Sequence, residues 1–210
     1  MIRSVPRGSG AVCAVCATCA VCAVLALLIP GDLAVAAGPE LEAIRKKAEP
    51  CTACHGPDGN STIPSIPSLA GQPKQFITTQ LVMFREGRRL NAQMAPFVAS
   101  LSNADINDLG TYFAAQARVA TGRPLSAEAM AAGRALAERL NCVQCHGPAL
   151  KGQQHIPGLN GQHTEYLRAQ LQGFKAQTRF DMDGNMTSAA QPLTAADIDL
   201  LAGYLASLPP

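Results

Sequence analysis

Apolar residues recur at helical spacing in two stretches of the chain. "GQPKQFITTQLVMFREGRR" (residues 71–89) and "GQHTEYLRAQLQGFKAQTR" (residues 161–179) carry glutamine, leucine and phenylalanine on one helical face. Opening helices are predicted upstream of each, over residues 39–49 and 126–140. No run alternates with the two-residue period of a strand over a useful length, so the pattern predicts an all-α fold.

A closing helix is expected near the end of each half of the chain. It begins after Ser102 in the first half and after Thr194 in the second, where a hydroxyl can cap the first turn. Asp105 and Asp197, each three residues further on, can reach back to complete a capping box.

The two halves are copies of one another. The stretches that begin at Gly71 and Gly161 match, and "MAPFVASLSNADINDLGTYFA" from Met94 matches "MTSAAQPLTAADIDLLAGYLA" from Met186. This indicates one duplicated domain of about 85 residues rather than a long repeat array. We predict tandem domains over residues 38–120 and 121–210, with a linker at about 118–126.

The first 37 residues have the features of an export signal. Arg3 and Arg7 precede an apolar run from Ala11 to Ile29, and small residues allow cleavage after Ala36 or Ala37. A retained membrane anchor is the alternative, but the apolar run is short for a span. Four cysteines lie within this run and are expected to be removed with it: Cys13, Cys16, Cys19 and Cys22.

Composition argues against nucleic acid as a partner and provides few aromatic side chains for the domain cores. The chain has 17 Lys plus Arg against 15 Asp plus Glu and shows no basic stripe, so nucleic-acid binding is not indicated. It has six Phe, three Tyr and no Trp, which is little aromatic volume for two domain cores. A bound group is therefore expected to fill part of each core.

The remaining cysteines all belong to a motif that occurs once per repeat. It reads "CTACH" at Cys51, Cys54 and His55, and "CVQCH" at Cys142, Cys145 and His146. A thioredoxin-like dithiol would need a βαβ pattern, which is missing, and a zinc ribbon does not suit a histidine adjacent to the second cysteine in separate repeats. Cys-x-x-Cys-His is the signature of covalent haem c attachment, with the histidine as proximal iron ligand.

Two methionines are candidates for the other axial position. Met94 and Met186 occupy matching places before the two closing helices. Met182 has no counterpart in the first repeat, and neither do His155 and His163, which we expect to be surface or loop residues. A thioether ligand raises the reduction potential and closes the iron to added ligands, which suits electron transfer rather than catalysis.

Two further matched pairs are expected near the haems. The backbone carbonyl of Pro67 or Pro157 could accept a hydrogen bond from the proximal histidine, although either residue could equally be a turn proline. Arg89 and Arg179 could pair with haem propionates or simply be solvated.

On these motifs the chain resembles the dihaem cytochrome c4 family, built of two class I cytochrome c domains. The resemblance covers almost everything after the export segment. It implies a periplasmic electron carrier that takes electrons from a quinol-oxidising cytochrome bc complex and delivers them to a terminal oxidase or reductase. Redox proteins are thus the expected partners, with peripheral association at membrane complexes.

The sequence departs from a strict repeat at two places. Gly133 of the second opening helix corresponds to Glu42 of the first, so the close helix contact that glycine permits is expected only in the second repeat. "MTS" replaces "MAP" at Met186, which is expected to loosen that loop and separate the two potentials.

Two other functions remain open at this point. The chain could be the dihaem electron-accepting subunit of a periplasmic oxidoreductase, such as a flavocytochrome-type sulfur-compound dehydrogenase. It could also be a dihaem enzyme such as a peroxidase, which would need one iron that is open or ligated by a second histidine.

Overall fold

The computed structural model describes residues 39–210, which belong to one compact unit and are helical. Within these residues the only β-type pairing is an isolated bridge between Gln153 and Ile156, so the expected all-α character is confirmed. The predicted export segment and its four cysteines lie outside the described residues. No helix between residues 39 and 210 has the length and apolar character to cross a bilayer.

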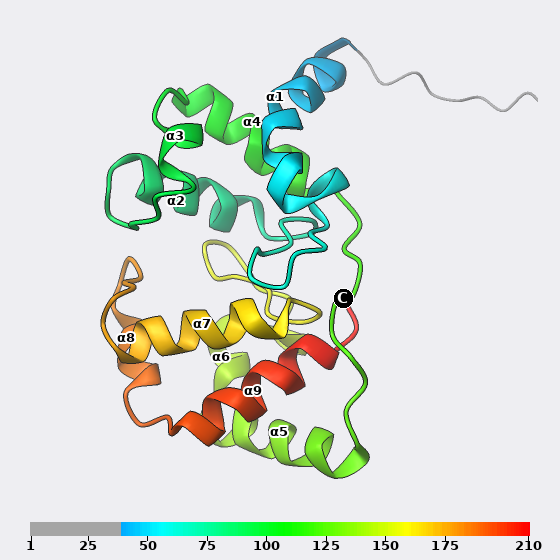
Figure 1. Cartoon of the computed structure of the whole chain (residues 1–210), viewed down its shortest axis with the longest axis vertical. Coiled ribbons are helices and arrows are strands. Elements are labelled where there is room, and N and C mark those ends of the chain that lie inside the picture. The colour runs from blue at the N-terminus through cyan, green and yellow to red at the C-terminus, as the bar shows by residue number, and fades with distance from the viewer. Residues whose placement is uncertain (1–38) are drawn as a thin grey trace, which may run out of the picture. The chain divides into compact units, whose positions relative to one another are not determined.

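The helices form two matching sets (Figure 1). The first set, blue to green in the figure, is α1 (Pro39–His55), α2 (Lys74–Arg85), α3 (Ala95–Val98) and α4 (Asn103–Ala114). The second set, green to red, is α5 (Ala127–Arg139), α6 (Cys142–His146), α7 (Thr164–Lys175), α8 (Asn185–Ala190) and α9 (Ala195–Ser207). The domain boundaries at 38–120 and 121–210 stay a prediction.

The opening helix differs between the repeats in how it reaches the cysteine motif. In the first repeat α1 continues through Pro50 and includes the whole motif, at the loss of one backbone hydrogen bond. In the second repeat Asn141 adopts a left-handed conformation, with φ of 54°, and separates α5 from α6. Asparagine tolerates this conformation better than most residues, so the helix ends there.

The closing helices start as the sequence predicts. The Ser102 hydroxyl accepts a hydrogen bond from the Asp105 backbone N–H, and the Asp105 carboxylate accepts one from the Ser102 backbone N–H. Thr194 and Asp197 form the same capping box at α9. Two orphan donors are satisfied at each helix start, which fixes where α4 and α9 begin.

Each closing helix packs against the other helices of its own repeat. In the first repeat the core gathers Ala48, Ile77, Leu109, Tyr112 and Phe113. The second core is more extensive and includes Leu136, Leu167, Phe174, Leu201 and Tyr204. The repeat with the smaller side-chain core is thus the one that most needs a bound group.

The connecting segment after α4 is tied to both repeats. Arg118 donates from Nε to the Ala70 carbonyl at 2.8 Å and from Nη1 to the Asn160 carbonyl at 3.0 Å. Burial lowers the pKa of Arg118 to about 10, and the guanidinium stays charged at neutral pH.

Two further residues of the connecting segment are also held. Val119 donates its backbone N–H to the Asn60 side chain, and the Thr121 hydroxyl donates to the Gly161 carbonyl.

Gly133 allows α5 to lie directly against α9. A Cβ atom at this position would overlap the Cβ of Tyr204, as the sequence comparison with Glu42 anticipated. The small residue therefore sets the distance between the opening and closing helices of the second repeat.

Gly133→Ala is expected to destabilise the holoprotein by about 1–2 kcal/mol, because overpacking at Tyr204 outweighs the helix propensity that alanine gains. Thermal unfolding followed by circular dichroism measures this. Glu42→Ala, at the matching position of α1, is the control and should stay within about 0.5 kcal/mol of wild type. Equal stability of the two variants would contradict close packing at Gly133.

Candidate functional site

The last turn of α1 and the short helix α6 present the two Cys-x-x-Cys-His motifs. His55 and His146 are buried, whereas Cys54 and Cys145 are exposed and Cys51 and Cys142 are half-buried. All four thiols are free. Burial raises the pKa of the Cys51 and Cys142 thiols, so both are protonated at neutral pH. Each motif therefore offers two unpaired sulfurs beside one buried imidazole.

Both histidines donate to a proline carbonyl, as the repeat alignment suggested. Nδ1 of His55 lies 2.8 Å from the Pro67 carbonyl oxygen, and Nδ1 of His146 lies 2.8 Å from that of Pro157. Burial lowers the pKa of both imidazoles, and the hydrogen bonds offset this only in part. Each ring is thus neutral with its proton on Nδ1, which leaves the Nε2 lone pair free to bind a metal.

The residue after each histidine must be glycine for the loop to turn. Gly56 has φ of 77° and Gly147 has φ of 76°. A Cβ at Gly56 would in addition overlap the carbonyl oxygen of Asn60. The turn brings residues 59–70 back beneath His55, which is how the Pro67 carbonyl reaches it.

A single cavity of about 1050 Å³ reaches both motifs. Ligand pockets commonly measure about 300–1,000 Å³, so this one is at the top of that range. Its lining includes all eight predicted site residues: Cys51, Cys54, His55, Met94, Cys142, Cys145, His146 and Met186. Apolar side chains of both cores also face it, among them Leu81, Phe113, Leu171 and Phe174.

The two methionines are held by polar residues five or fewer positions before them. The Asn91 side-chain oxygen accepts from the Met94 backbone N–H at 2.9 Å. In the second repeat the Asp181 carboxylate accepts from the Met186 N–H at 2.8 Å and from both N–H and hydroxyl of Thr187. Thr187 thus supplies a side-chain hydrogen bond that "MAP" lacks, and a looser "MTS" loop stays a prediction.

The carboxylate of Asp181 is ionised in this setting. Burial alone would raise its pKa, but the hydrogen bonds from the Met186 N–H and from Thr187 lower it below the usual value. Asn91 fills the same role without charge. The side chains that hold the two methionines, Asn91 and Asp181, thus differ by one negative charge, a difference that sequence matching alone did not single out.

The competing ligands differ in their surroundings. Met182 is 65% exposed, although it borders the cavity. His155 pairs weakly with Asp183, at 3.8 Å from Nε2 to the carboxylate. His163 is a loop residue as expected, but it is buried rather than on the surface, and its Nε2 donates to the Ser61 carbonyl at 2.9 Å. Of the two settings expected, surface or loop, His163 has the loop, and it is buried because its ring packs against the first repeat.

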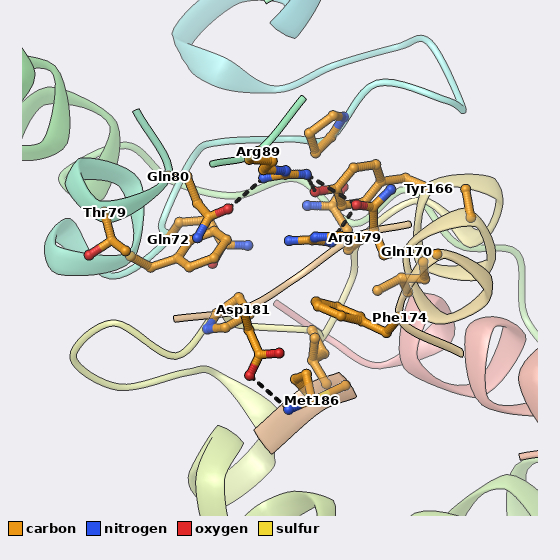
Figure 2. A pocket seen from close by; sticks show the side chains of 18 of the residues that line it. Gln72, Thr79, Gln80, Arg89, Tyr166, Gln170, Phe174, Arg179, Asp181 and Met186 are labelled. Carbon is orange, nitrogen blue, oxygen red and sulfur yellow. Dashed lines mark hydrogen bonds between the residues drawn. The ribbon is translucent and has the colours of Figure 1, made fainter. Parts of the chain in front are cut away.

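Two arginines meet at the cavity wall (Figure 2). Arg89 donates to Gln80 at 2.6 Å, to the Tyr166 hydroxyl at 3.2 Å and to Gln170 at 3.1 Å. Arg179 donates to Gln170 and stacks on Phe174, with 4.5 Å from its guanidinium carbon to the ring centre.

Neither Arg89 nor Arg179 forms an ion pair with a carboxylate in the described residues, although the charge of Asp181 acts on Arg179 and opposes the effect of burial on its pKa. Burial lowers the pKa of Arg179 to about 10, and its buried Nε has no hydrogen-bond partner among residues 39–210. Burial raises the pKa of Tyr166, but the two arginines outweigh it and lower that pKa. An acidic group of a bound molecule would satisfy both the charge and the orphan donor. Pairing of Arg89 and Arg179 with haem propionates stays a prediction.

The residues present fit covalent haem at each motif. Free thiols lie beside a neutral histidine with an available Nε2, a thioether lines the same cavity, and the wall carries unsatisfied positive charge. In the described part of the chain, no group of three or more His, Cys, Asp or Glu could hold a bare metal ion.

Two protein-family models match the chain, one on each repeat. The model "Cytochrome C oxidase, cbb3-type, subunit III" matches residues 37–113, and the model "Cytochrome c" matches residues 130–209. The two matches fall on the two halves that the internal repeat defines.

Similar proteins match more than three quarters of the chain. Cytochrome c4 of Pseudomonas aeruginosa is 36% identical over 84% of this chain and 92% of its own. The thiosulfate dehydrogenase electron acceptor of Thiomonas intermedia is 34% identical over 85% of this chain and 88% of its own. The crystal structure of reduced cytochrome c4 from Pseudomonas stutzeri superposes with a TM-score of 0.73 at 30% identity, over 80% of this chain and 98% of that one.

Replacing Met94 or Met186 by alanine is expected to remove the methionine-to-iron absorption band of one haem and so to halve the band of the oxidised holoprotein. Met182→Ala, which removes the exposed thioether, is the control and should leave the band intact. If either Met94→Ala or Met186→Ala leaves the spectrum unchanged, the assignment of that ligand is wrong.

Proposed function

Because the chain belongs to the cytochrome c4 family, we propose that it carries single electrons in the periplasm from a respiratory donor, such as a quinol-oxidising cytochrome bc complex, to a terminal oxidase or reductase. The expected tandem cytochrome c fold and the two covalent haem c groups are confirmed by the matched families and structures. The expected functional class is confirmed as well: the chain is an electron-transfer protein rather than an enzyme.

The observation that carries the proposal is the identical anchoring of the two histidines on one shared cavity. In both repeats a buried neutral imidazole donates Nδ1–H to a proline carbonyl and can offer Nε2 to iron. Each bound haem supplies one-electron oxidation and reduction. We assign Cys51, Cys54, Cys142 and Cys145 to its covalent attachment, and His55, Met94, His146 and Met186 to the ligation of its iron.

The protein's own residues set the conditions for this transfer. As ligands, Met94 and Met186 would leave no position on the iron for an added molecule, which suits electron transfer and not reaction with a substrate such as peroxide. The apolar wall excludes water and so favours the less charged, reduced state. The first 37 residues, with the features of an export signal, support the periplasmic location.

Exposed apolar side chains at the cavity rim suit transient redox partners. Leu90 is 88% exposed and Phe180, its counterpart, is 53% exposed. Both border the cavity, as does Phe97. Since the chain's net charge is small, docking there depends on this local apolar surface rather than on long-range attraction.

A second function is favoured by one of the similar proteins. The relative from Thiomonas intermedia is named a thiosulfate dehydrogenase electron acceptor. The alternative is therefore that this chain is the dihaem electron-accepting subunit of a periplasmic sulfur-compound oxidoreductase. Both functions use the same haem sites and differ only in the donor.

Reduction of the oxidised holoprotein by membranes of its host distinguishes the two donors. A carrier in the respiratory chain should be reduced when quinol is added, and an inhibitor of the cytochrome bc complex should block this reduction. The alternative predicts instead that thiosulfate with periplasmic extract reduces the protein and that it purifies in a stable, stoichiometric complex. Reduction by thiosulfate alone, without response to quinol, would contradict the main proposal.

Asp181→Asn is expected to raise the reduction potential of the second haem, because the negative carboxylate at Met186 stabilises the oxidised iron. The reciprocal change Asn91→Asp should lower the potential of the first haem. Potentiometric titration of both variants measures the shifts. Shifts of the same sign in the two variants would show that charge at this position does not set the potential.

A further inference from the structure

Two buried glutamines reach from each repeat into the other. Gln162 of the second repeat accepts from the Ser68 N–H and donates to the Ser68 carbonyl, both at 2.9 Å. Gln72 of the first repeat makes the same two bonds with Gly158, both at 2.9 Å. The residues joined are 94 and 86 positions apart in sequence. Gln72 is 4% exposed and Gln162 is 2% exposed, so neither side chain has water as an alternative partner.

Each glutamine binds the peptide group that anchors a motif histidine. The Ser68 N–H belongs to the same peptide unit as the Pro67 carbonyl, which accepts from Nδ1 of His55. Likewise the Gly158 N–H shares its peptide unit with the Pro157 carbonyl, which accepts from Nδ1 of His146. In each case the peptide donates its N–H to the glutamine of one repeat, and its carbonyl oxygen accepts from the motif histidine of the other repeat. Two hydrogen bonds through one peptide unit therefore connect the two side chains.

Such a chain of hydrogen bonds changes the basicity of the histidine at its end. An acceptor on the N–H side of a peptide increases the negative charge on its carbonyl oxygen, which strengthens the bond that the oxygen accepts by roughly 10–30%. A stronger acceptor at Nδ1 makes the imidazole more basic at Nε2 and fixes the ring orientation. A more basic ligand stabilises the oxidised iron and lowers its potential.

We propose that Gln162 positions and polarises His55, and that Gln72 does the same for His146, so that each repeat tunes the haem ligand of the other. This rests on the proposed role of the two histidines as iron ligands. The haem potential of one repeat is then set in part by a residue of its neighbour, and neither repeat has its full potential when separated.

The loops that carry the two bonded peptides differ in how many contacts hold them to the opposite repeat. The backbone N–H of His163 also donates to Gln162 at 3.1 Å, and the His163 ring holds the Ser61 carbonyl of the same loop. Pro73 stands at the matching place in the first repeat and supplies neither contact. The loop beneath His55 thus has a second anchor beside the glutamine, whereas Gly158 has no counterpart of the His163 contacts.

The test uses Gln162→Leu and Gln72→Leu in the full-length holoprotein, since leucine keeps the volume and removes the polar atoms. Histidine ring N–H signals of the reduced protein, labelled with ¹⁵N, report each Nδ1 bond separately. Gln162→Leu should move the His55 Nδ1–H signal upfield and leave that of His146 nearly unchanged. Gln72→Leu should do the reverse.

The potentials should follow the same crossed pattern. Loss of the polarising bond is expected to shift the one-electron equilibrium of the haem in the opposite repeat toward the reduced state by roughly twofold, or about 18 mV since a tenfold change is 59 mV. His163→Ala, which loosens the same interface without touching the Ser68 peptide, is the control and should leave the His55 Nδ1–H signal in place.

Three results would overturn the proposal: equal shifts at both histidines, a shift only within the mutated repeat, or no shift. If a leucine variant fails to load haem, the shorter Gln162→Asn and Gln72→Asn variants keep a polar group and should show the crossed pattern at smaller size. The wild-type spectrum tests the ligand roles independently, because ligand histidines carry large ring-current shifts from the haem. Their absence would refute the proposed function without reference to any glutamine variant.

Discussion

The hydrogen bond between each motif histidine and a proline carbonyl is the contact on which the rest of the site depends. It fixes the tautomer, keeps Nε2 free and holds the ring within a buried wall. Building it requires the left-handed turn at Gly56 or Gly147, which directs the following loop back under the ring. The loop in turn needs an anchor of its own, and the opposite repeat supplies that anchor.

Local sequence signals were sufficient for the parts of the structure that short-range chemistry determines. The capping boxes at Ser102 and Thr194 formed as predicted, because a hydroxyl and a carboxylate three residues apart satisfy two orphan donors without outside help. Matching Pro67 with Pro157 across the repeats named both as candidate histidine acceptors beside the alternative of a turn proline, and the structure shows the acceptor role. The spacing of Cys, Cys and His indicated covalent haem before any helix was placed.

Contacts between the repeats were beyond the reach of pattern reading. Nothing in the sequence pairs Gln162 with Ser68 or buries His163, since both contacts depend on how one repeat packs against the other. The continuity of α1 through Pro50 was also not predicted, because tertiary packing compensates for the lost hydrogen bond. The charge difference between Asn91 and Asp181 was visible in the sequence, but its link to the methionine loops required the backbone geometry.

The segment around Arg118 has a consequence for how such proteins can be recombined. Its guanidinium donates to the carbonyl groups of Ala70 and Asn160, one from each repeat. The connecting segment is therefore itself part of the packing between the repeats. A chimera that borrows one half from a homologue would join surfaces that did not diverge together. The natural unit of exchange, in engineering and in inheritance, is therefore the pair of repeats together with the connecting segment rather than a single repeat.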